Sequence, residues 1–544
     1  MERQELSLPP RSVTSPPPPA APAPSEAAAA STSSGATLEA PRLPTQHSLS
    51  STKQSTMTEY TNKPVSLRRS AEIDKQILKL IVKNCHPFSL VEQKEFKDLI
   101  NMIIPGNKLP TRKTVSNSIL PKSYQECLQI VQLEIASAYA ICIITDSWTS
   151  VNNVSFVSVT AHFIDNGNMK SYLLDCFPFS ERHTAVNITE YLKIKFQEWK
   201  IEQKIIAIVS DNAANIVAAI RDGGWRHIGC FAHSINLSVQ ACHRELATTL
   251  TRVKSIKQMG LPKLKLKQDV VTRWNATFDM LQRFYKLKEA IISTLAILDT
   301  QHEQLSSHDW IIVEKTIDIL EIFYDITNEI SAENNISLSK VIVLCKIMIR
   351  HVNKKINEEG TSGLIEIRLL LNTLRQQLND RFKNVENNAL YAEASILDPR
   401  FKKYGFKDEN VCKIVINNLK KKISDTIVEP TTSKNKLIWE DFDTELNSRL
   451  RPQNQTAAGI RELDKYIDDE MLPRTYDPLK WWEERKRIYP MLYNFMAKRL
   501  CVVATSVPCE RVFSKAGHIL NERRTSLKDD KVNKILFLNC NMKE

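Results

Sequence analysis

Between residues 138 and 232, short apolar runs rich in β-branched residues alternate with short polar connections. The runs AYAICIIT, VSFVSVTAHFI and MKSYLLDCF have the length and composition of strands. A helical segment, AVNITEYLKIKFQEWK, then leads to a fourth apolar run, IIAIV. A second helix opens at SDNAANIVAAI, and WRHIGCFAHS supplies a fifth short strand. Three consecutive strands followed by helix, strand, helix and strand predict a mixed α/β sheet over residues 136–233.

Beyond His233 the strand pattern fades, and apolar residues recur at helical spacing for more than 200 positions. Examples are VEKTIDILEIFYDITNEI, SKVIVLCKIMI and GLIEIRLLLNTLRQQLNDRF. This pattern predicts that residues 234–475 form an α-helical insertion that interrupts the α/β unit. Residues 476–544 are again helical and rich in aromatic and apolar residues. We expect their amphipathic faces to dock against the sheet or against a second copy of the chain.

The amino-terminal part differs from the rest of the chain in composition. Ten of the 24 prolines fall within the first 44 residues, among Ala and Ser runs, which predicts a disordered leader over residues 1–65. A Pro-rich ligand segment is the alternative. Two amphipathic patterns, AEIDKQILKLIVKNC and VEQKEFKDLINMII, then predict a small helical unit over 70–135. Its basic NKLPTRK loop could contact phosphates or could be a solvated surface.

Charge and cysteine content narrow the class of protein. The chain has 74 Lys and Arg against 62 Asp and Glu, a net charge of +12, which favours a polyanionic partner such as DNA. Its 11 cysteines form no CxxC pair, so we expect reduced thiols in an intracellular protein. No run approaches 18 consecutive apolar residues, and the first residues lack the apolar region of a signal peptide. Neither membrane spanning nor secretion is expected.

Two aspartates stand at the polar ends of predicted strands. Asp146 follows the first apolar run, and Asp211 follows the fourth. Carboxylates at the ends of such strands point into one crevice. If Glu510, in TSVPCERVFSKAGHIL, converges on them, the three form a divalent-metal site for cutting nucleic acid. Alternatively, the aspartates cap helices or turns, and Glu510 pairs with Arg511 or Arg523.

Six ordered motifs resemble one family. They are TDSWTS, SDNAAN, CFAHSINL, TRWN, LDPRF, and TSVPCERVFSKAGHIL with a downstream NERRTSL. Together they resemble the hAT transposases and the BED-type zinc-finger proteins descended from them, over about residues 70–544. The resemblance implies an RNase H-like mixed sheet interrupted by a large helical insertion, an α/β plus α fold, and a C-terminal dimerisation region.

The resemblance also implies a function. The family's acidic triad falls on Asp146, Asp211 and Glu510, which would hold Mg²⁺ or Mn²⁺ for DNA cleavage and joining of a 3′ hydroxyl to target DNA. A nuclear location, DNA binding, and a homodimer or a heterodimer with BED-finger relatives follow as expectations. The alternative is a domesticated, non-cutting protein that dimerises and acts in transcription or chromatin.

A basic run, RVKSIKQMGLPKLKLK, precedes the TRWN motif. Basic side chains followed by an exposed aromatic suit a DNA backbone with an unpaired or flipped base. The family's matching tryptophan, implicated at the DNA end, falls on Trp274. Alternatively, Trp274 is a core aromatic and the lysines are a solvated face. Trp148 is expected to pack. The candidate DNA-binding residues are Arg273, Trp274, Lys263, Lys265 and Lys267.

Cys230 and His233 form a CxxH that the family also carries. One Cys and one His give half of a four-ligand zinc site, which His227, Cys242 or His243 could complete; otherwise these side chains pack or hydrogen-bond within the fold. The chain departs from the family in three places. It shows no BED-finger pattern of CxxC with spaced histidines, the part between His243 and Arg273 is short, and Cys509 replaces a commoner serine.

Overall fold

A computed structural model describes most of the chain beyond the predicted leader. The described residues are 65–149, 154–179, 181–258, 273–298, 305–332, 335–424, 445, 455–519 and 529–542. Residues 1–64 of the predicted leader lie outside them.

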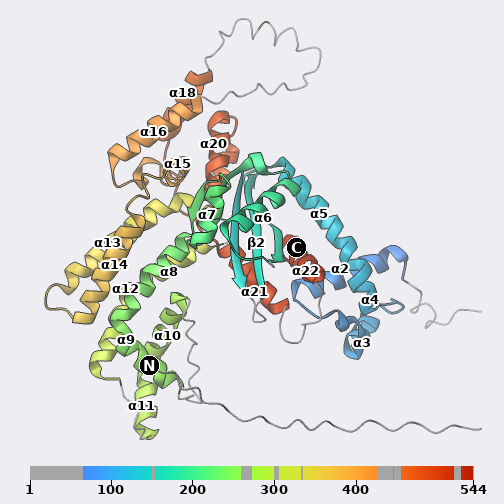
Figure 1. The fold of residues 1–544 in the computed structure, drawn as a ribbon, viewed down its shortest axis with the longest axis horizontal. Helices are drawn as coiled ribbons and strands as arrows, with labels where there is room; N and C mark the ends of the chain where they lie inside the picture. The colour runs from blue at the N-terminus through green and yellow to red at the C-terminus, as the bar shows by residue number, and fades with distance from the viewer. Residues whose placement is uncertain are drawn as a thin grey trace, which may run out of the picture. The chain divides into compact units, whose positions relative to one another are not determined.

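One five-stranded sheet forms the centre of the α/β part, in the order β3-β2-β1-β4-β5 (Figure 1). The strands β1, β2 and β3 are antiparallel neighbours, whereas β4 runs parallel to β1 and β5 parallel to β4. The predicted mixed sheet of five strands is therefore confirmed. The strands are β1 (Ile141–Thr149), β2 (Ser155–Asp165), β3 (Asn168–Pro178), β4 (Ile205–Ser210) and β5 (His227–Gly229).

The turn between β2 and β3 sets the register of the hairpin. Asn166 and Gly167 have positive φ angles of 46° and 67°, the conformation that a two-residue hairpin turn requires and that Asn-Gly adopts with little strain. A Cβ at Gly167 would also lie 2.8 Å from the Cβ of Glu483. The turn therefore needs glycine for both its backbone conformation and its space.

Helices from opposite ends of the sequence pack against the sheet. The helices α6 (Ala185–Glu198) and α7 (Ala214–Asp222) contact each other, and α7 also contacts β4 and β5. From the C-terminal end, α21 (Val507–Ile519) packs against β1 and β2, and α22 (Asp529–Asn541) packs against β3 (Figure 1). The expected docking of the last segment against the sheet is therefore present.

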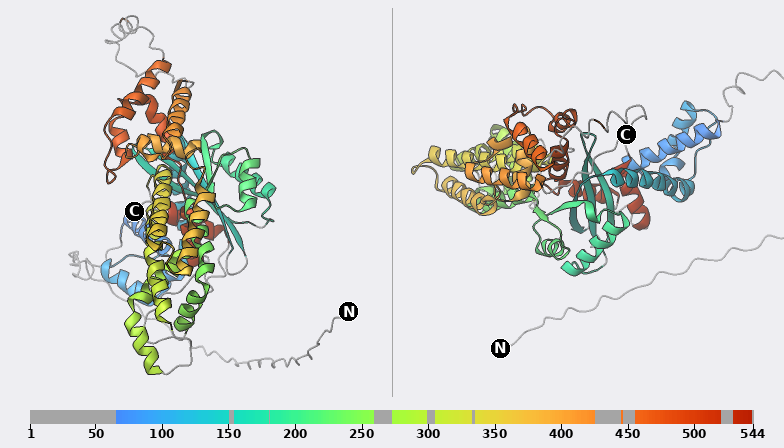
Figure 2. Two further views of the ribbon diagram at one scale, coloured as in Figure 1. Left: turned by 90° about the vertical axis from the view of Figure 1, so that its left-hand side faces the viewer. Right: turned by 90° about the horizontal axis from the view of Figure 1, so that it is seen from above.

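The described residues that follow β5 contain helices and no strand. The helices α13 (Val341–Glu359) and α14 (Ile365–Phe382) run side by side in this part, as their labels in Figure 1 and their yellow colour in Figure 2 show. The α-helices before α21 are α8 (Phe231–Cys242), α9 (Ala247–Gln258), α10 (Trp274–Lys286), α11 (Lys288–Leu298), α12 (Ser307–Ser331), α13 (Val341–Glu359), α14 (Ile365–Phe382), α15 (Ala389–Leu397), α16 (Glu409–Ser424), α18 (Gln455–Asp468), α19 (Pro478–Glu484) and α20 (Pro490–Leu500). Short 3-10 helices are η3 (Glu202–Lys204), η4 (His243–Leu246), η5 (Leu338–Lys340) and η6 (Lys402–Gly405).

The N-terminal helices are joined to the C-terminal one. Both α2 and α5 contact α22, and Asn539 of α22 donates through Nδ2 to the carbonyl of Val82, at 2.7 Å. The helices α2, α5 and α22 thus share one core. The elements here are α2 (Leu67–Lys83), η1 (Phe88–Glu92), α3 (Lys94–Ile103), α4 (Arg112–Thr114), the π-helical turn η2 (Val115–Ile119) and α5 (Leu120–Ser137).

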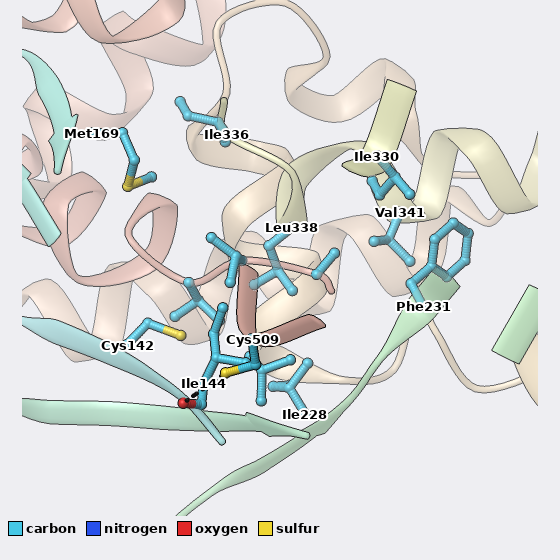
Figure 3. Packing of buried hydrophobic residues seen from close by; sticks show 14 of the residues in the cluster. Cys142, Ile144, Met169, Ile228, Phe231, Ile330, Ile336, Leu338, Val341 and Cys509 are labelled. Carbon is cyan, nitrogen blue, oxygen red and sulfur yellow. Dashed lines mark hydrogen bonds between the residues drawn. The ribbon is translucent and has the colours of Figure 1, made fainter. Parts of the chain in front are cut away.

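A buried apolar cluster joins the sheet to α21 and to the helical part (Figure 3). Cys509 of α21 is fully buried, and its thiol donates a weak hydrogen bond to the carbonyl of Ile144 in β1, at 3.6 Å. All 11 cysteines are free. None of the helices described in the structure is long and apolar enough to cross a membrane.

Candidate metal and nucleic-acid site

Three carboxylates from distant parts of the sequence line one cleft of about 360 Å³. Asp146 lies on β1, Asp211 follows β4, and Glu510 lies in the first turn of α21. In the parallel pair of β1 and β4, Ile144 is opposite Val209, and each aspartate lies two residues further along. The two aspartates therefore follow the paired stretch of two neighbouring strands, whose backbones lie about 5 Å apart. All three side chains that the sequence singled out therefore line one cleft.

Local backbone contacts orient the two aspartates. Asp146 accepts a hydrogen bond through Oδ1 from the backbone N–H of Ser147 at 2.8 Å. Asp211 accepts one through Oδ1 from the backbone N–H of Ala213 at 3.2 Å, just before α7 begins. The alternative role of Asp211 as a turn residue is thus also fulfilled. Each aspartate keeps a second carboxylate oxygen for another partner.

Glu510 is paired with a residue that the sequence did not single out as its partner. Its Oε2 lies 3.2 Å from Nη2 of Arg273, and the two side chains are 40% and 62% exposed. Arg511, one of the two expected partners, donates instead to the carbonyl of Ser331 at 2.7 Å. Arg523, the other, lies outside the described residues. An exposed pair of this kind contributes about 0–1 kcal/mol, so other charges can displace it.

The cleft makes the ionised form of Asp146 unfavourable. The pKa of Asp146 is raised to about 7, chiefly by burial and also by the nearby carboxylates of Asp211 and Glu510, while the hydrogen bond from the Ser147 N–H acts in the opposite direction. Clustered carboxylates repel one another, and a bound cation would relieve that repulsion. Nevertheless, no three His, Cys, Asp or Glu side chains within the described ranges are placed to hold a metal as they stand. Carboxylate oxygens are the donors that a hard divalent cation such as Mg²⁺ or Mn²⁺ prefers, and Glu510 would have to leave Arg273 to become one of them.

Asp146→Asn should stabilise the metal-free protein at alkaline pH. The folded-state pKa near 7 exceeds the ordinary value of 3.8. Ionised Asp146 therefore destabilises the fold fully above pH 7, progressively less between pH 7 and 3.8, and not at all below. We expect a gain of about 1–3 kcal/mol in the free energy of unfolding at pH 8, falling to less than half at pH 5. Urea unfolding of both proteins in chelator measures it. If the variant and the wild type are equally stable at both pH values, the Asp146 carboxylate is neither buried nor confined among like charges.

Trp274 is not exposed, which corrects its expected role as a base-stacking residue. Its side chain is 1% exposed and packs against Phe278 and Tyr324, and its backbone N–H donates to Oδ1 of Asn236 in α8 at 3.0 Å. The helical pattern after Trp274 turns its ring toward α12, so the core-aromatic alternative is correct. Trp274 anchors the start of α10 and leaves the preceding Arg273 at the cleft. Lys263, Lys265 and Lys267 lie outside the described residues.

Replacing Trp274 should therefore lower stability. We expect Trp274→Ala to reduce the free energy of unfolding by about 3–5 kcal/mol, because a large buried side chain leaves a cavity. Trp274→Phe should cost less than half of that, since the ring remains and the indole N–H, which is buried without a hydrogen-bond partner, is removed. Urea unfolding measures both variants. A loss below about 1 kcal/mol for the alanine variant would place the indole on the surface.

Trp148 provides the aromatic wall of the cleft. It stacks on Phe513 of α21 with ring centroids 5.9 Å apart and contacts Phe156 at 5.7 Å. Trp148 and Phe513 both line the cleft. The expectation that Trp148 packs is confirmed, and the structure adds that its packing partner belongs to the helix that carries Glu510. Sequence alternation placed Trp148 beside Asp146 but gave no sign of Phe513.

Cys230 joins α8 to the segment before α21. Its sulfur accepts hydrogen bonds from the backbone N–H groups of His233 and Ser506, each at 3.3 Å. The neighbouring Phe231 N–H donates to the Ala504 carbonyl at 2.8 Å. These bonds fix the approach of α21, and His233 and Ser506 both line the cleft. Such contacts are structural, which is the reading that the sequence favoured for this CxxH.

The other candidate zinc ligands near Cys230 have local contacts. Ser210 Oγ and His227 Nε2 lie within hydrogen-bond distance, at 3.0 Å, and the Cys242 thiol donates to the Ser238 carbonyl at 3.3 Å. The sequence also missed Asn236, which holds Trp274. Asn236 belongs to the CFAHSINL motif, and that position was the one sign in the sequence that it has a role.

Models of three protein-family regions match parts of the chain. Residues 144–222 match the ZBED1 RNase-like domain, and residues 212–319 match the ZBED1 RNase-like helical domain. Residues 462–542 match the hAT family C-terminal dimerisation region. The first match includes Asp146 and Asp211, and the last includes Glu510.

Relatives resemble the chain over most of its length at low identity. A putative transcriptional regulator, tpeD, of Talaromyces stipitatus is 23% identical over 90% of this chain and 67% of its own. The putative AC transposase of Zea mays is 23% identical over 82% of this chain and 62% of its own. The human zinc finger BED domain-containing protein 4 is 22% identical over 89% of this chain and 44% of its own. The matched part thus spans about half to two thirds of these relatives.

Proposed function

We propose, from the premise that this chain is a transposase-derived protein of the hAT family, that it binds DNA and cleaves it with a divalent metal ion. The metal would be held by Asp146, Asp211 and Glu510. In this proposal residues 136–233 and 476–544 together form the catalytic core, 234–475 form the inserted helical region, and 70–135 form a small helical unit. The printed name of the Zea mays relative, a putative transposase, supports the reaction class.

One observation carries the proposal, namely the convergence of three carboxylates from β1, the end of β4 and α21 in one cleft. The pKa of Asp146 is raised to about 7 by burial first and by the charges of Asp211 and Glu510 second, so both neighbours contribute to its environment. Clustering of like charges destabilises a fold, and such clusters are found where a cation or a reaction requires them. Separate structural roles for the three residues would not need a shared cleft.

The residues that line the cleft would have different roles in strand cleavage. Bound Mg²⁺ or Mn²⁺ would activate a water or hydroxyl nucleophile and stabilise the leaving oxygen. Arg273 is the cleft's guanidinium and is suited to pair with a phosphate oxygen of the DNA strand. Trp148 and Phe513 close one side of the cleft, restricting where a nucleotide can lie. A 3′ hydroxyl released by cleavage would then be the nucleophile for joining to target DNA.

The assembly and location form part of the same proposal. We expect a homodimer, or a heterodimer with BED-finger relatives, because residues 462–542 match a region named for dimerisation. A nuclear location fits the net charge of +12 and the printed names of the transcriptional and BED-finger relatives.

A non-cutting DNA-binding regulator is the second candidate, and the Arg273–Glu510 pair favours it. With Glu510 held at 3.2 Å by Arg273, one of the three carboxylates is already neutralised. A domesticated protein could keep this pair as a structural contact. The printed name of the Talaromyces relative, a putative transcriptional regulator, points to the same class.

A nicking assay separates the two candidates. Purified protein is incubated with supercoiled plasmid in Mn²⁺ or Mg²⁺, with chelator as the control. The proposal predicts nicked circles that require the metal and are lost in Asp146→Asn. Nicking that persists equally in the variant would come from a contaminating nuclease, and its complete absence with intact DNA binding would favour the regulator.

A further inference from the structure

Arg273 is the positive charge of the carboxylate cleft. Among the described residues that line it, Arg273 is the only Lys or Arg, facing Asp146, Asp211 and Glu510. Its Nη2 lies 3.2 Å from Oε2 of Glu510. A guanidinium stays charged at any physiological pH, so its contact with Glu510 competes directly with a cation for that carboxylate.

The backbone of Arg273 is fixed while its side chain is accessible. Arg273 is the residue immediately before α10, and the next residue, Trp274, is buried and held through its N–H by Asn236. The Arg273 side chain itself is 62% exposed and makes its described ion pair only with Glu510. An anchored backbone with an exposed long side chain lets the guanidinium change partner without moving α10.

We propose that Arg273 is a gate on the metal site, which releases Glu510 when a nucleic-acid phosphate enters the cleft. Without DNA, the guanidinium neutralises Glu510 and weakens cation binding. Glu510 accepts a single hydrogen bond from the guanidinium, whereas a phosphate group presents two oxygens to its planar fork, so a phosphate draws Arg273 away and frees Glu510. Metal and DNA then bind cooperatively, each raising the affinity for the other. This inference rests on the proposed function, because it needs both ligands in one cleft.

The expected change in Mn²⁺ affinity depends on the strength of the Arg273–Glu510 ion pair, which must break before Glu510 can bind the cation. An exposed ion pair is weak, and removing a nearby positive charge also favours a cation. Arg273→Gln should therefore tighten Mn²⁺ binding in the absence of DNA by about 3- to 10-fold. Arg273→Lys keeps the positive charge and loses the planar guanidinium. Its Mn²⁺ affinity without DNA should lie between those of the wild type and Arg273→Gln. Arg221→Gln is the matched control, because the Arg221 side chain in α7 is exposed and pairs with Asp222, and this variant should bind Mn²⁺ as the wild type does.

The test is a calorimetric titration of Mn²⁺ into the full chain, with and without a short DNA duplex. The gate predicts that DNA tightens Mn²⁺ binding by several fold more in the wild type than in Arg273→Gln. Equal Mn²⁺ affinity of both proteins without DNA, or an equal gain from DNA, overturns the gate and leaves the metal site standing. No Mn²⁺ binding by either protein overturns the metal site itself. Thermal unfolding of each variant confirms that it is folded.

Discussion

Asp211→Asn should lower the rate of metal-dependent DNA nicking by about 1,000-fold or more, which corresponds to about 4 kcal/mol of transition-state stabilisation. The side chain keeps its shape, and its Oδ1 can still accept the hydrogen bond from the Ala213 N–H. Only the charge that would bind the cation is lost. Glu510→Gln and Asp146→Asn should have effects of similar size, because the three carboxylates act on the same ions.

A carboxylate outside the cleft provides the control for these substitutions. Asp222 lies at the end of α7, and its side chain is 53% exposed. Asp222→Asn should nick DNA at the wild-type rate. Initial rates on supercoiled plasmid, measured at saturating Mn²⁺, compare all four variants. A loss of less than about 10-fold for Asp211→Asn would remove that residue from the metal site.

Ending the chain at residue 528, which removes α22, should abolish folding. The helix buries five apolar side chains, each contributing about 1.5–3 kcal/mol, or about 8–15 kcal/mol together. A typical domain has a net stability of about 5–15 kcal/mol, so this loss is comparable to the whole. The five are Val532, Ile535, Leu536, Phe537 and Leu538. Circular dichroism and urea unfolding of the truncated chain provide the measurement.

The polar residues of α22 add to this effect. Asn541 exchanges two hydrogen bonds with the backbone of Leu173 in β3, both at 2.8 Å, and Asn539 contacts the end of α2. Asp530→Ala, on the exposed side of the same helix, should change stability by less than about 0.5 kcal/mol. A truncated chain that folds normally and loses only its dimer would contradict this account.

The C-terminal helices belong to the core of the chain itself. The helices α21 and α22 lie within the matched dimerisation region, and both pack into the chain's own core. Loss of a dimer in the chain that ends at residue 528 would therefore follow from unfolding, whatever the interface. The sequence predicted apolar helical faces here correctly. The packing partner of such a face is a long-range property, and helical spacing alone does not specify it.

The sheet was predictable because its strands carry strong local signals. The β-branched runs of β1, β2 and β4 and the Asn166-Gly167 turn each specify their conformation within a few residues. The two aspartates were predictable for the same reason, since strand ends of neighbouring parallel strands share one edge. Glu510 came from the family resemblance, because nothing local links it to residues some 300 positions earlier.

Two features of the site depended on tertiary packing. Trp274 reads as well for a surface aromatic as for a core one, and its 1% exposure comes from contacts with α8 and α12. The pairing of Glu510 with Arg273, and not with its neighbour Arg511, depends on the direction in which α21 enters the cleft. That direction is set by the hydrogen bonds of Cys230, which no local pattern reveals.

The most direct test of the central claim maps which residues surround the bound cation. The divalent ion is replaced by Fe²⁺, ascorbate and peroxide are added, and the resulting backbone cuts in the folded chain are located by mass spectrometry. The account predicts three clusters of cuts, near Asp146, Asp211 and Glu510, all suppressed by excess Mn²⁺ and lost in Asp211→Asn. Cuts near only one of these residues, or only elsewhere in the chain, would contradict a shared metal site.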